Sequence, residues 1–425
     1  MLNKTLNLKI NTYFKRVPDF FWIYLFFMWF FFMALAVFTN YYHGFVKSRS
    51  FPFNSFVPAP GFGDFSLAMS EWIAFNGFGG TGWGVSYFPA TYLLLNSILY
   101  IMSSNFTLSL FFSLSFWYFG GSLLIYKFLK KFGFLQFLII FCLVILSYPS
   151  ILIFVTGNLE SWIAILLLFA AVSAYQLNWN FFAICIGIAG AMKGVPLIFI
   201  LLPLFLLGKK SGAIVALKTL IISSALTIFS LIFLPNGFLD SGLSGVGRAI
   251  TGIQASQEKY TDLMVNSIAG VHYGHSFLNA IHSLFGMETM PSNFWGPIIF
   301  WLLMGFLMIL LYLQRVAGVE LWTSALAIGS VACTAVATST DYKLLYLAPA
   351  LLLASKSDLS DKFQKPLLVL TVFAMVPKPW LYTGIDPWTN ATVYLTSAAL
   401  ILILILSFIQ TIYLIRRQRM INMLI

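Results

Sequence analysis

Charged side chains are scarce in this sequence. Asp, Glu, Lys and Arg make up 9% of the 425 residues, whereas they make up roughly 25% of a typical soluble domain. Hydrophobic residues account for 60% and aromatic residues for 18%, and the mean hydropathy is +0.91. This composition excludes a soluble globular protein and predicts a polytopic membrane protein. Because a charge is costly inside a bilayer, the few charges within or beside apolar runs are candidates for function.

Cysteine and acidic residues are also few. Cys142, Cys185 and Cys333 each lie within an apolar stretch, without the spacing of a metal site or a disulfide pair. The 24 Lys and Arg against 13 Asp and Glu give a net charge of +11. The basic residues cluster at the ends of apolar segments, where they orient a membrane protein, and this argues against nucleic acid as a partner. No small-residue cleavage site follows the first apolar stretch, so we expect a retained first helix.

Apolar segments of about spanning length recur along the chain. A spanning helix needs roughly 20 apolar residues. We predict spans at about 19–39, 106–127, 134–155, 161–177, 212–234, 294–313, 320–338, 342–354, 366–377 and 391–414. With the apolar stretch at 180–207, these segments predict an all-α, polytopic bundle of about 12 transmembrane helices, within a range of roughly 10–13, that forms a single domain over 1–425.

Basic residues predict the direction of each span, because cytoplasmic loops are enriched in Lys and Arg. If the basic N-terminal segment is cytoplasmic, residues 40–105 begin outside and the basic turn at 127–133 lies inside. The short apolar segment at 88–102 is then a helix in the outer interface and not a span. Both termini are expected in the cytoplasm, and two large segments, 40–105 and 235–293, face outward.

One lysine, Lys193, stands near the middle of the apolar stretch at 180–207. A single long helix here would place the basic "GKK" at 208–210 outside and would invert every later loop. Two short helices that meet near Lys193 return this turn to the cytoplasm. Gly194 is permissive, and Pro196 lacks an amide donor, which suits the start of a new helix. We therefore predict a helix break that opens toward the external side; the alternative is an intramembrane lysine satisfied within one helix.

The first external segment, 40–105, contains two acids. Asp64 is either the N-cap of a short helix over 63–75 or a carboxylate that acts as general base on an acceptor hydroxyl. Glu71 lies two helical turns further along the same face, so both acids can point into one cavity. The alternative for Glu71 is a solvated loop acid.

The second external segment, 235–293, is rich in glycine at 236–252. This composition predicts a mobile substrate-gating loop, with Arg248 available to bind a phosphate. The "HYGH" motif carries His272 and His275, but no carboxylate or cysteine falls nearby at a recognised ligand spacing. We therefore predict no metal site and no cofactor.

Polar residues also collect at the outer ends of later spans. Asn158 and Glu160 precede the fourth predicted span, where Asn158 is either a helix cap or part of a cavity. Asp341, Tyr342 and Lys343 lie at the outer end of another span. Tyr342 and Lys343 are also typical of interfacial anchors, whereas an Asp beside them is less expected of an anchor.

These acids and bases are predicted to collect on one side of the membrane. Lys193, Lys343 and Arg248 could together neutralise a phosphate, while Asp64 or Glu71 supplies a base. Glycosyl transfer from a lipid phosphate requires this combination, because a sugar hydroxyl is a poor nucleophile until it is deprotonated and the leaving phosphate gains charge. Such a reaction needs no nucleotide, which agrees with the absence of a Walker loop from the sequence.

Short motifs follow one another between residues 15 and 355. They are "GFGDFSLAMSEW", "YFPATYLLLN", "GNLESW", "AGAMKGVPLIFILLPLFLL" and "DYKLLYLAP". In order and spacing this series resembles the GT-C superfamily of integral-membrane glycosyltransferases, and most of all its bacterial members that use a polyprenyl-phosphate sugar. In that superfamily an external Asp, a Tyr-Pro-Pro interfacial helix, a Gly-Gln/Asn turn and a Lys-x-x-Pro element occur in this order.

The resemblance implies roles for individual residues. Asp64 would be the catalytic base or an acid that positions the acceptor, and Lys193 would contact the lipid phosphate. The residues implied to line the substrate cavity are Tyr87, Asn158, Glu160, Asp341, Tyr342 and Lys343. The first external segment has no Asp-x-Asp or Asp-Glu pair, which disfavours a metal-dependent or dolichol-linked mannosyltransferase.

The implied activity is the inverting transfer of a sugar from a polyprenyl-phosphate donor to a lipid-linked surface polysaccharide such as O-antigen. A narrower resemblance to serotype-converting O-antigen glucosyltransferases implies glucose and a site on the periplasmic face of the bacterial inner membrane. The expected partners are this donor, a lipid-linked glycan acceptor and membrane lipids. Two other classes stay open. An O-antigen polymerase or ligase would be expected to use several external arginines, and a transporter or flippase to carry charges at mid-membrane with internal repeats.

Overall fold

The computed structural model describes residues 20–41, 88–102, 105–234, 237–266, 276–278, 280–281, 292–335, 341–378 and 391–424. The described residues are 87% helical and contain no strand. The helices are α1 (Phe20–Tyr41), α3 (Pro89–Ile101), α4 (Phe106–Ser115), η2 (Phe116–Gly120), α5 (Gly121–Leu129), α6 (Phe134–Val144), α7 (Tyr148–Thr156), α8 (Glu160–Tyr175), α9 (Trp179–Met192), η3 (Val195–Ile200), α10 (Leu201–Leu206), α11 (Lys209–Phe233), α12 (Phe238–Asn266), α15 (Ser292–Ala317), α16 (Leu321–Thr334), η5 (Asp341–Leu347), α17 (Ala348–Ala354), α18 (Gln364–Met375) and α19 (Ala391–Leu424). Of these, η2 is a π-helix, and η3 and η5 are 3₁₀-helices.

Most predicted spans coincide with helices, but many of these helices are short. Within the described residues, five are long and apolar enough to cross a membrane, and a sixth span forms if α6 and α7, bent by 64°, count as one. Other apolar helices, such as α8, α9 and α16, have 10–17 residues. A multi-pass membrane protein is supported, whereas the count of about 12 spans stays a prediction.

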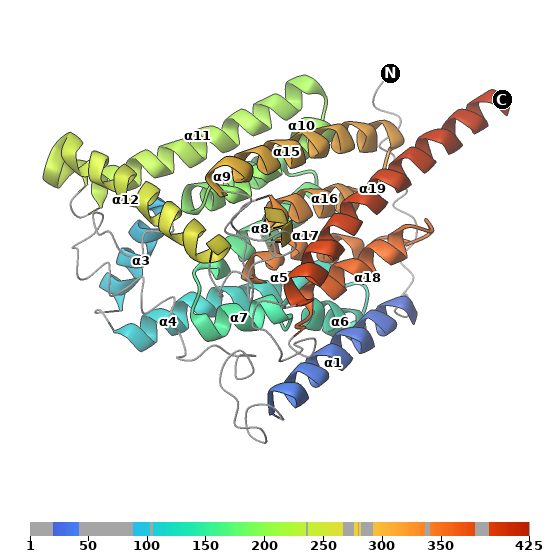
Figure 1. Ribbon diagram of the computed structural model, residues 1–425, viewed down its shortest axis with the longest axis horizontal. Helices are drawn as coiled ribbons and strands as arrows, with labels where there is room; N and C mark the ends of the chain where they lie inside the picture. The colour runs from blue at the N-terminus through green and yellow to red at the C-terminus, as the bar shows by residue number, and fades with distance from the viewer. Residues whose placement is uncertain are drawn as a thin grey trace.

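The molecule buries its short helices and exposes apolar side chains on its outer ones. Nearly all of α8 and α16 is buried, whereas Phe27, Phe31 and Phe111 on outer helices are exposed. Figure 1 places α8 and α17 at the centre, with α11 and α15 on one side and α4, α6 and α7 on the other. An exposed apolar surface of this kind suits lipid acyl chains, because only in a bilayer does it carry no hydrophobic cost.

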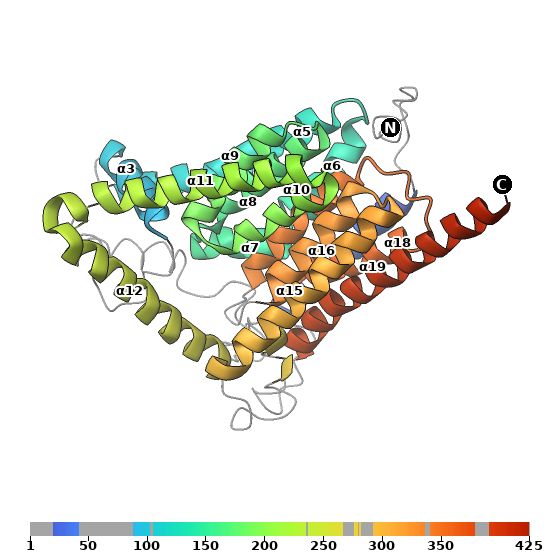
Figure 2. The same ribbon diagram turned by 90° about the horizontal axis from the view of Figure 1, so that it is seen from above.

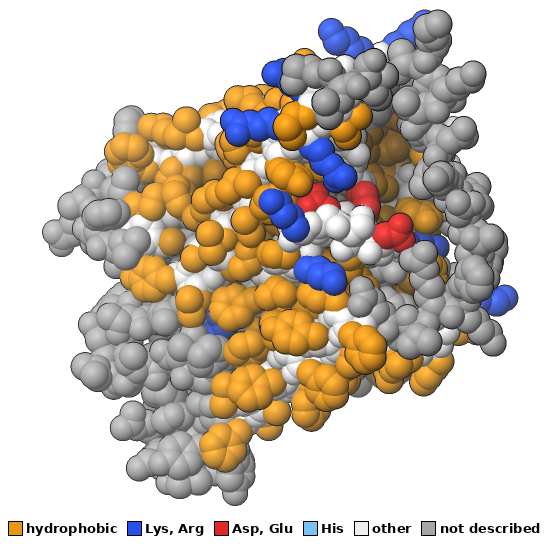
Figure 3. Space-filling model, turned by 90° about the vertical axis from the view of Figure 1, so that its right-hand side faces the viewer, with side chains coloured by type: hydrophobic (Ala, Val, Ile, Leu, Met, Phe, Trp, Pro, Cys, Tyr) orange, Lys and Arg blue, Asp and Glu red, His pale blue; other side chains and the backbone are white. Residues whose placement is uncertain are grey.

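Lys and Arg side chains gather at one end of the bundle, the face that Figure 3 presents, among a few acids. At this end, residues from segments that are distant in the sequence contact one another. The Lys362 ammonium lies 4.2 Å from the Tyr413 ring centroid, and the Lys365 ammonium lies 5.5 Å from that of Phe21. The Gln418 side chain donates to the Ala317 carbonyl at 3.0 Å. The first helix, the α17–α18 turn and the end of α19 therefore meet at this basic end.

Lys356, in the α17–α18 turn, sits among three aromatic rings at the basic end. Its ammonium lies 3.8 Å from the ring centroid of Phe128, 4.8 Å from that of Tyr175 and 5.7 Å from that of Phe132. These contacts tie the ends of α5 and α8 to the turn through cation–π attraction. Burial, and to a smaller extent the nearby Lys131 ammonium, lower the pKa of Lys356 to about 8.

This lowered pKa predicts a pH dependence of stability. Between about pH 8 and the usual lysine pKa of 10.5, the unfolded chain holds a proton that the folded protein has lost, so stability should rise with pH. In detergent, the melting temperature of the wild type is expected to increase across this window relative to that of Lys356→Met. Below pH 8 the two curves should run parallel. Parallel curves up to pH 10.5 would show that the aromatic rings hold Lys356 in its charged form.

The predicted helix break at Lys193 is confirmed. Helix α9 ends at Met192, Lys193 has an extended backbone (φ −160°, ψ 126°), and η3 begins at Val195. A Cβ atom built on Gly190 would lie 2.3 Å from the Leu197 side chain, so η3 folds back along α9. The long apolar stretch is therefore two short pieces and not one helix.

The packing of α9 and α11 shows that the chain reverses at this break. Lys218, in the first half of α11, donates to Asn180 at the start of α9, at 2.7 Å. Further along both helices, Gly190 of α9 lies against Ser223 of α11. The two helices therefore run parallel, and η3 with α10 must carry the chain back between them. This return places Lys209 at the same end of the bundle as the start of α9, as the charge pattern predicts.

Helix α3, predicted to lie in the outer interface, is attached to the break by its first turn. The Met192 carbonyl accepts hydrogen bonds from the Phe88 amide at 2.9 Å and from the Thr91 hydroxyl at 2.9 Å. A Cβ on Gly194 would lie 3.2 Å from the Phe88 ring. With 13 residues, α3 is too short to span a bilayer. The start of α3, within residues 40–105, thus lies beside Lys193.

The prediction of a loop at 236–252 is wrong. Helix α12 covers Phe238–Asn266, with a kink at Gly242, where φ is 59°. Apolar residues such as Leu239, Leu243 and Ile250 recur at helical spacing, and this periodicity outweighs the glycine content. In Figure 2, α12 lies apart from the centre of the bundle and runs from the end of α11 toward the start of α15. Its gating role stays a prediction.

The close contact of α16 with η5 predicts the effect of one substitution. A Cβ on Gly329 would lie 2.5 Å from the Tyr346 carbonyl oxygen, so Gly329→Ala must displace the backbone of η5. We expect a loss of about 1–3 kcal/mol in the free energy of unfolding, typical of overpacking. Gly305→Ala in α15 is the control, because nothing lies within 4 Å of its Cβ, and it should stabilise slightly. Equal melting temperatures for both variants would contradict this packing.

Candidate functional site

The short turn between α7 and α8 places a glutamate at the first position of a buried helix. Gly157 adopts a left-handed conformation (φ 66°) and ends α7. Asn158 follows, and its side-chain oxygen accepts a hydrogen bond from the Glu160 amide at 2.9 Å. This Asx turn starts α8 at Glu160. Leu159, and not Asn158, is the N-cap of α8, but the Asn158 side chain accepts from the first amide of the helix and so fixes where the Glu160 side chain begins.

Glu160 and Lys193 form an ion pair between two helix ends. Glu160 Oε1 pairs with Lys193 Nζ, and Glu160 Oε2 accepts a hydrogen bond from the Tyr346 hydroxyl at 3.0 Å. The Glu160 side chain is 1% exposed and the Lys193 side chain is 15% exposed. The start of α8, the break after α9 and η5 thus meet at one carboxylate.

Two further predicted residues join this group from η5. The Lys193 ammonium lies 5.6 Å from the centroid of the Tyr342 ring. Lys343 is 1% exposed and interacts electrostatically with both Lys193 and Glu160. The Cys333 thiol donates to the Lys343 carbonyl at 3.2 Å and holds η5 against α16. We call the residues Glu160, Lys193, Tyr342, Lys343 and Tyr346 the break cluster.

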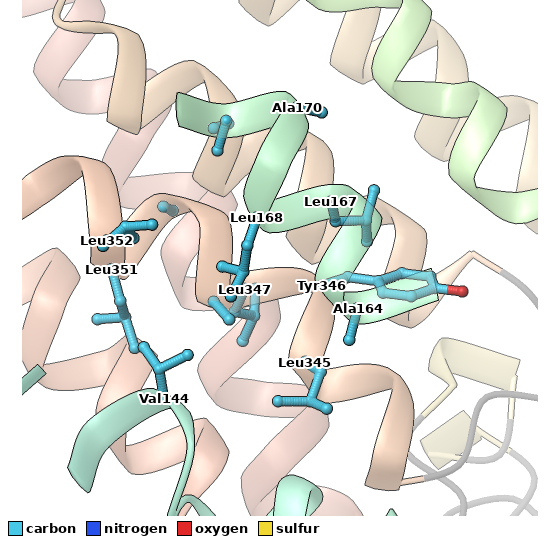
Figure 4. Close-up of a cluster of buried hydrophobic side chains, with 14 of the residues drawn as sticks. Val144, Ala164, Leu167, Leu168, Ala170, Leu345, Tyr346, Leu347, Leu351 and Leu352 are labelled. Atoms are coloured by element: carbon cyan, nitrogen blue, oxygen red, sulfur yellow. The ribbon is translucent and has the colours of Figure 1, made fainter. Parts of the chain in front are cut away.

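The apolar surroundings fix the tyrosine of the break cluster. In Figure 4, the Tyr346 ring lies beside Ala164 and Leu167 of α8, and its hydroxyl points away from the labelled aliphatic side chains. Leu345 and Leu347, its neighbours in η5, are buried. The ring is thus held by packing, while its polar atom reaches Glu160. An ordered phenol at this place gives the carboxylate a partner that does not depend on Lys193.

The break cluster combines two lysine side chains, one carboxylate and two phenols. Lysine ammonium groups are point charges of the kind that bind phosphate, and the ammonium of Lys193 already faces an anion, the Glu160 carboxylate. Lys193 is the more exposed of the two. Lys193 is therefore the more accessible lysine of the cluster, and the start of α3 meets the break beside it.

Other predicted site residues do not join the break cluster or lie outside the described residues. Arg248 is exposed on α12, which packs on α11 and α15, and its role as a third cation stays a prediction. Asp64, Glu71 and Tyr87 lie outside the described residues, and so does the side chain of Asp341. The roles predicted for these four residues therefore stay predictions.

That the site holds no metal ion also stays a prediction. Among the described residues, no group of three or more His, Cys, Asp or Glu could hold a metal ion. His272 and His275 of the "HYGH" motif lie outside these residues.

Tyr346 was not among the predicted site residues. An α-helix over 342–354 would place Tyr342 and Tyr346 on one face. In the 3₁₀-helix η5, with three residues per turn, Lys343 and Tyr346 share a face instead. The sequence signal for Tyr346 is the spacing of three between Lys343 and Tyr346 in "KLLY", which predicts a shared face only if the segment is a 3₁₀-helix.

Comparisons of the chain with protein-family models, with curated proteins and with solved structures find no match.

Proposed function

We propose that this protein is a GT-C-type glycosyltransferase that moves a sugar from a polyprenyl-phosphate donor to a lipid-linked surface polysaccharide. The observation that carries the proposal is the break cluster. Two lysines, Lys193 and Lys343, are held with one glutamate at a helix break, at the point where the start of α3 docks. A lipid phosphate needs such cations, and the hydrophobic surroundings suit its polyprenyl chain.

In the proposed reaction, the Asp64 carboxylate removes the proton from an acceptor hydroxyl. The resulting oxygen attacks the anomeric carbon of the donor as the bond from that carbon to the phosphate oxygen breaks. The sugar is transferred with inversion, and polyprenyl phosphate leaves with one more negative charge. Lys193 and Lys343 stabilise this developing charge. No metal ion or other cofactor is needed, because the lysines supply the positive charge.

The proposed location is the bacterial inner membrane, with the site facing the periplasm and both termini in the cytoplasm. The basic end of the bundle would then be cytoplasmic, in agreement with the positive-inside rule. The break cluster involves the helix ends at 157–160 and 192–195, whereas the opposite end of α8, at Tyr175, contacts Lys356 of the basic end. The narrower proposal is a glucosyltransferase that modifies O-antigen precursors.

A donor panel tests the proposal. Purified protein would be mixed with a lipid-linked glycan acceptor and one of several radiolabelled donors: polyprenyl-phosphate sugars, the matching nucleotide sugars, or a polyprenyl-diphosphate glycan. We expect label on the acceptor only with a polyprenyl-phosphate sugar. Transfer of an intact glycan from the diphosphate donor would indicate a polymerase or ligase instead. No transfer from any polyprenyl-phosphate sugar would overturn the proposal.

A further inference from the structure

The two oxygens of the Glu160 carboxylate have different partners. Oε1 pairs with the Lys193 ammonium, and Oε2 accepts the Tyr346 hydroxyl at 3.0 Å. The helix start that carries Glu160 is fixed by the Asn158 side chain. If Lys193 moves away, the carboxylate therefore keeps one hydrogen bond and its backbone position. Glu160 is built to remain in place while Lys193 changes partner.

Lys193 has the freedom that Glu160 lacks. Lys193 follows the last residue of α9 and has an extended backbone. Its side chain is 15% exposed, whereas that of Glu160 is 1% exposed. A lysine side chain has four rotatable carbon–carbon bonds, so its ammonium can turn toward an arriving anion without a change in the backbone. The more exposed member of the ion pair is thus also the more adaptable one.

We propose that Glu160 is an internal counterion for which the donor phosphate substitutes at Lys193, while Tyr346 retains the displaced carboxylate. This inference rests on the proposed function and assigns Glu160 and Tyr346 as positioning residues. A carboxylate and a phosphate both present anionic oxygens to an ammonium, so they compete for Lys193. Glu160 keeps Lys193 ordered in the empty site and takes it back when polyprenyl phosphate leaves.

The exchange predicts opposite effects on phosphate affinity for a substitution of Glu160 and for a substitution of its partner Tyr346. Glu160→Gln removes the competing anion, so a phosphate should bind about tenfold more tightly, because less of the Lys193 population is held by another partner. Tyr346→Phe removes the second partner of Glu160 and leaves the carboxylate more dependent on Lys193. A phosphate should then bind several-fold more weakly. A merely structural role for Glu160 would not move the two affinities in opposite directions.

Binding of a short-chain polyprenyl phosphate to the purified full chain in detergent tests the exchange, with calorimetry as the readout. Inorganic phosphate serves as a second probe, because it lacks the prenyl chain. Lys218→Met is the matched control, since Lys218 pairs with a neutral Asn180 on the neighbouring helix, and it should bind as the wild type does. In transfer assays, Glu160→Gln should lower the KM for the donor without raising kcat.

The possible results separate this inference from the proposed function. If the wild type binds polyprenyl phosphate and folded Glu160→Gln binds it equally or more weakly, the exchange is overturned and the proposed function stands. If the wild type does not bind it at all, both are overturned. If Glu160→Gln does not fold, Tyr346→Phe decides, because an affinity equal to or tighter than that of the wild type contradicts the exchange.

Discussion

Lys193→Met is expected to destabilise the protein strongly. The substitution leaves the Glu160 carboxylate, 1% exposed, without the ammonium that now faces it. Removing one member of a buried ion pair typically costs about 3–5 kcal/mol, because an uncompensated charge stays buried. The expected result is a lower temperature at which half of the purified protein remains soluble in detergent.

The double variant Lys193→Met with Glu160→Gln gives the matching test. It removes both charges and keeps similar side-chain volumes, and such replacements are often close to neutral. We expect it to recover most of the stability that Lys193→Met loses, so that the two effects are far from additive. Lys218→Met, which loses only a hydrogen bond to Asn180, should change stability by about 1 kcal/mol or less. Additive losses in the double variant would contradict the ion pair.

Asp64→Asn is expected to reduce sugar transfer by about 10²–10⁴-fold, the usual range for the loss of a general base. An amide cannot take the proton of the acceptor hydroxyl, although it fills the same space. Asp64 lies in the segment that leads to Phe88, which is hydrogen-bonded to the Met192 carbonyl beside Lys193. This attachment brings the end of that segment to the cations that would hold the leaving phosphate.

Glu71→Gln is the control for this substitution, because Glu71 is the other acid of the same segment. Initial rates at saturating donor and acceptor would be compared with those of the wild type. If Asp64 is the base, Glu71→Gln should keep most of the activity. The reverse result would move the role of base to Glu71, and full activity in Asp64→Asn would contradict the assignment of Asp64.

The helices and the break at Lys193 could be predicted because their signals are local or additive. Apolar run length located α1, α11 and α15 to within a few residues. The break followed from the charges at 208–210 together with Gly194 and Pro196. These signals survive in a single sequence because hydropathy and turn chemistry act over a few neighbouring residues.

Contacts between distant helix ends could not be predicted in the same way. Glu160 and Lys193 are 33 positions apart, and Tyr346 is 186 positions from Glu160. No spacing rule links such residues, since the path of several intervening helices decides whether they meet. The 3₁₀ geometry of η5 and the bend between α6 and α7 depend on packing in the same way. Asn158 and Glu160 could be singled out as candidates because charges and amides are rare in this chain.

The central claim is that the lysine at the helix break acts on the phosphate of a lipid-linked sugar donor. The most direct measurement compares transfer of label from a polyprenyl-phosphate sugar by the wild type and by the Lys193→Met, Glu160→Gln double variant. Equal melting temperatures would first establish that both proteins are folded. Because Lys193 is proposed to stabilise charge in the transition state, we expect the double variant to transfer about 10²–10³-fold more slowly. Transfer by the double variant at the wild-type rate would contradict the claim.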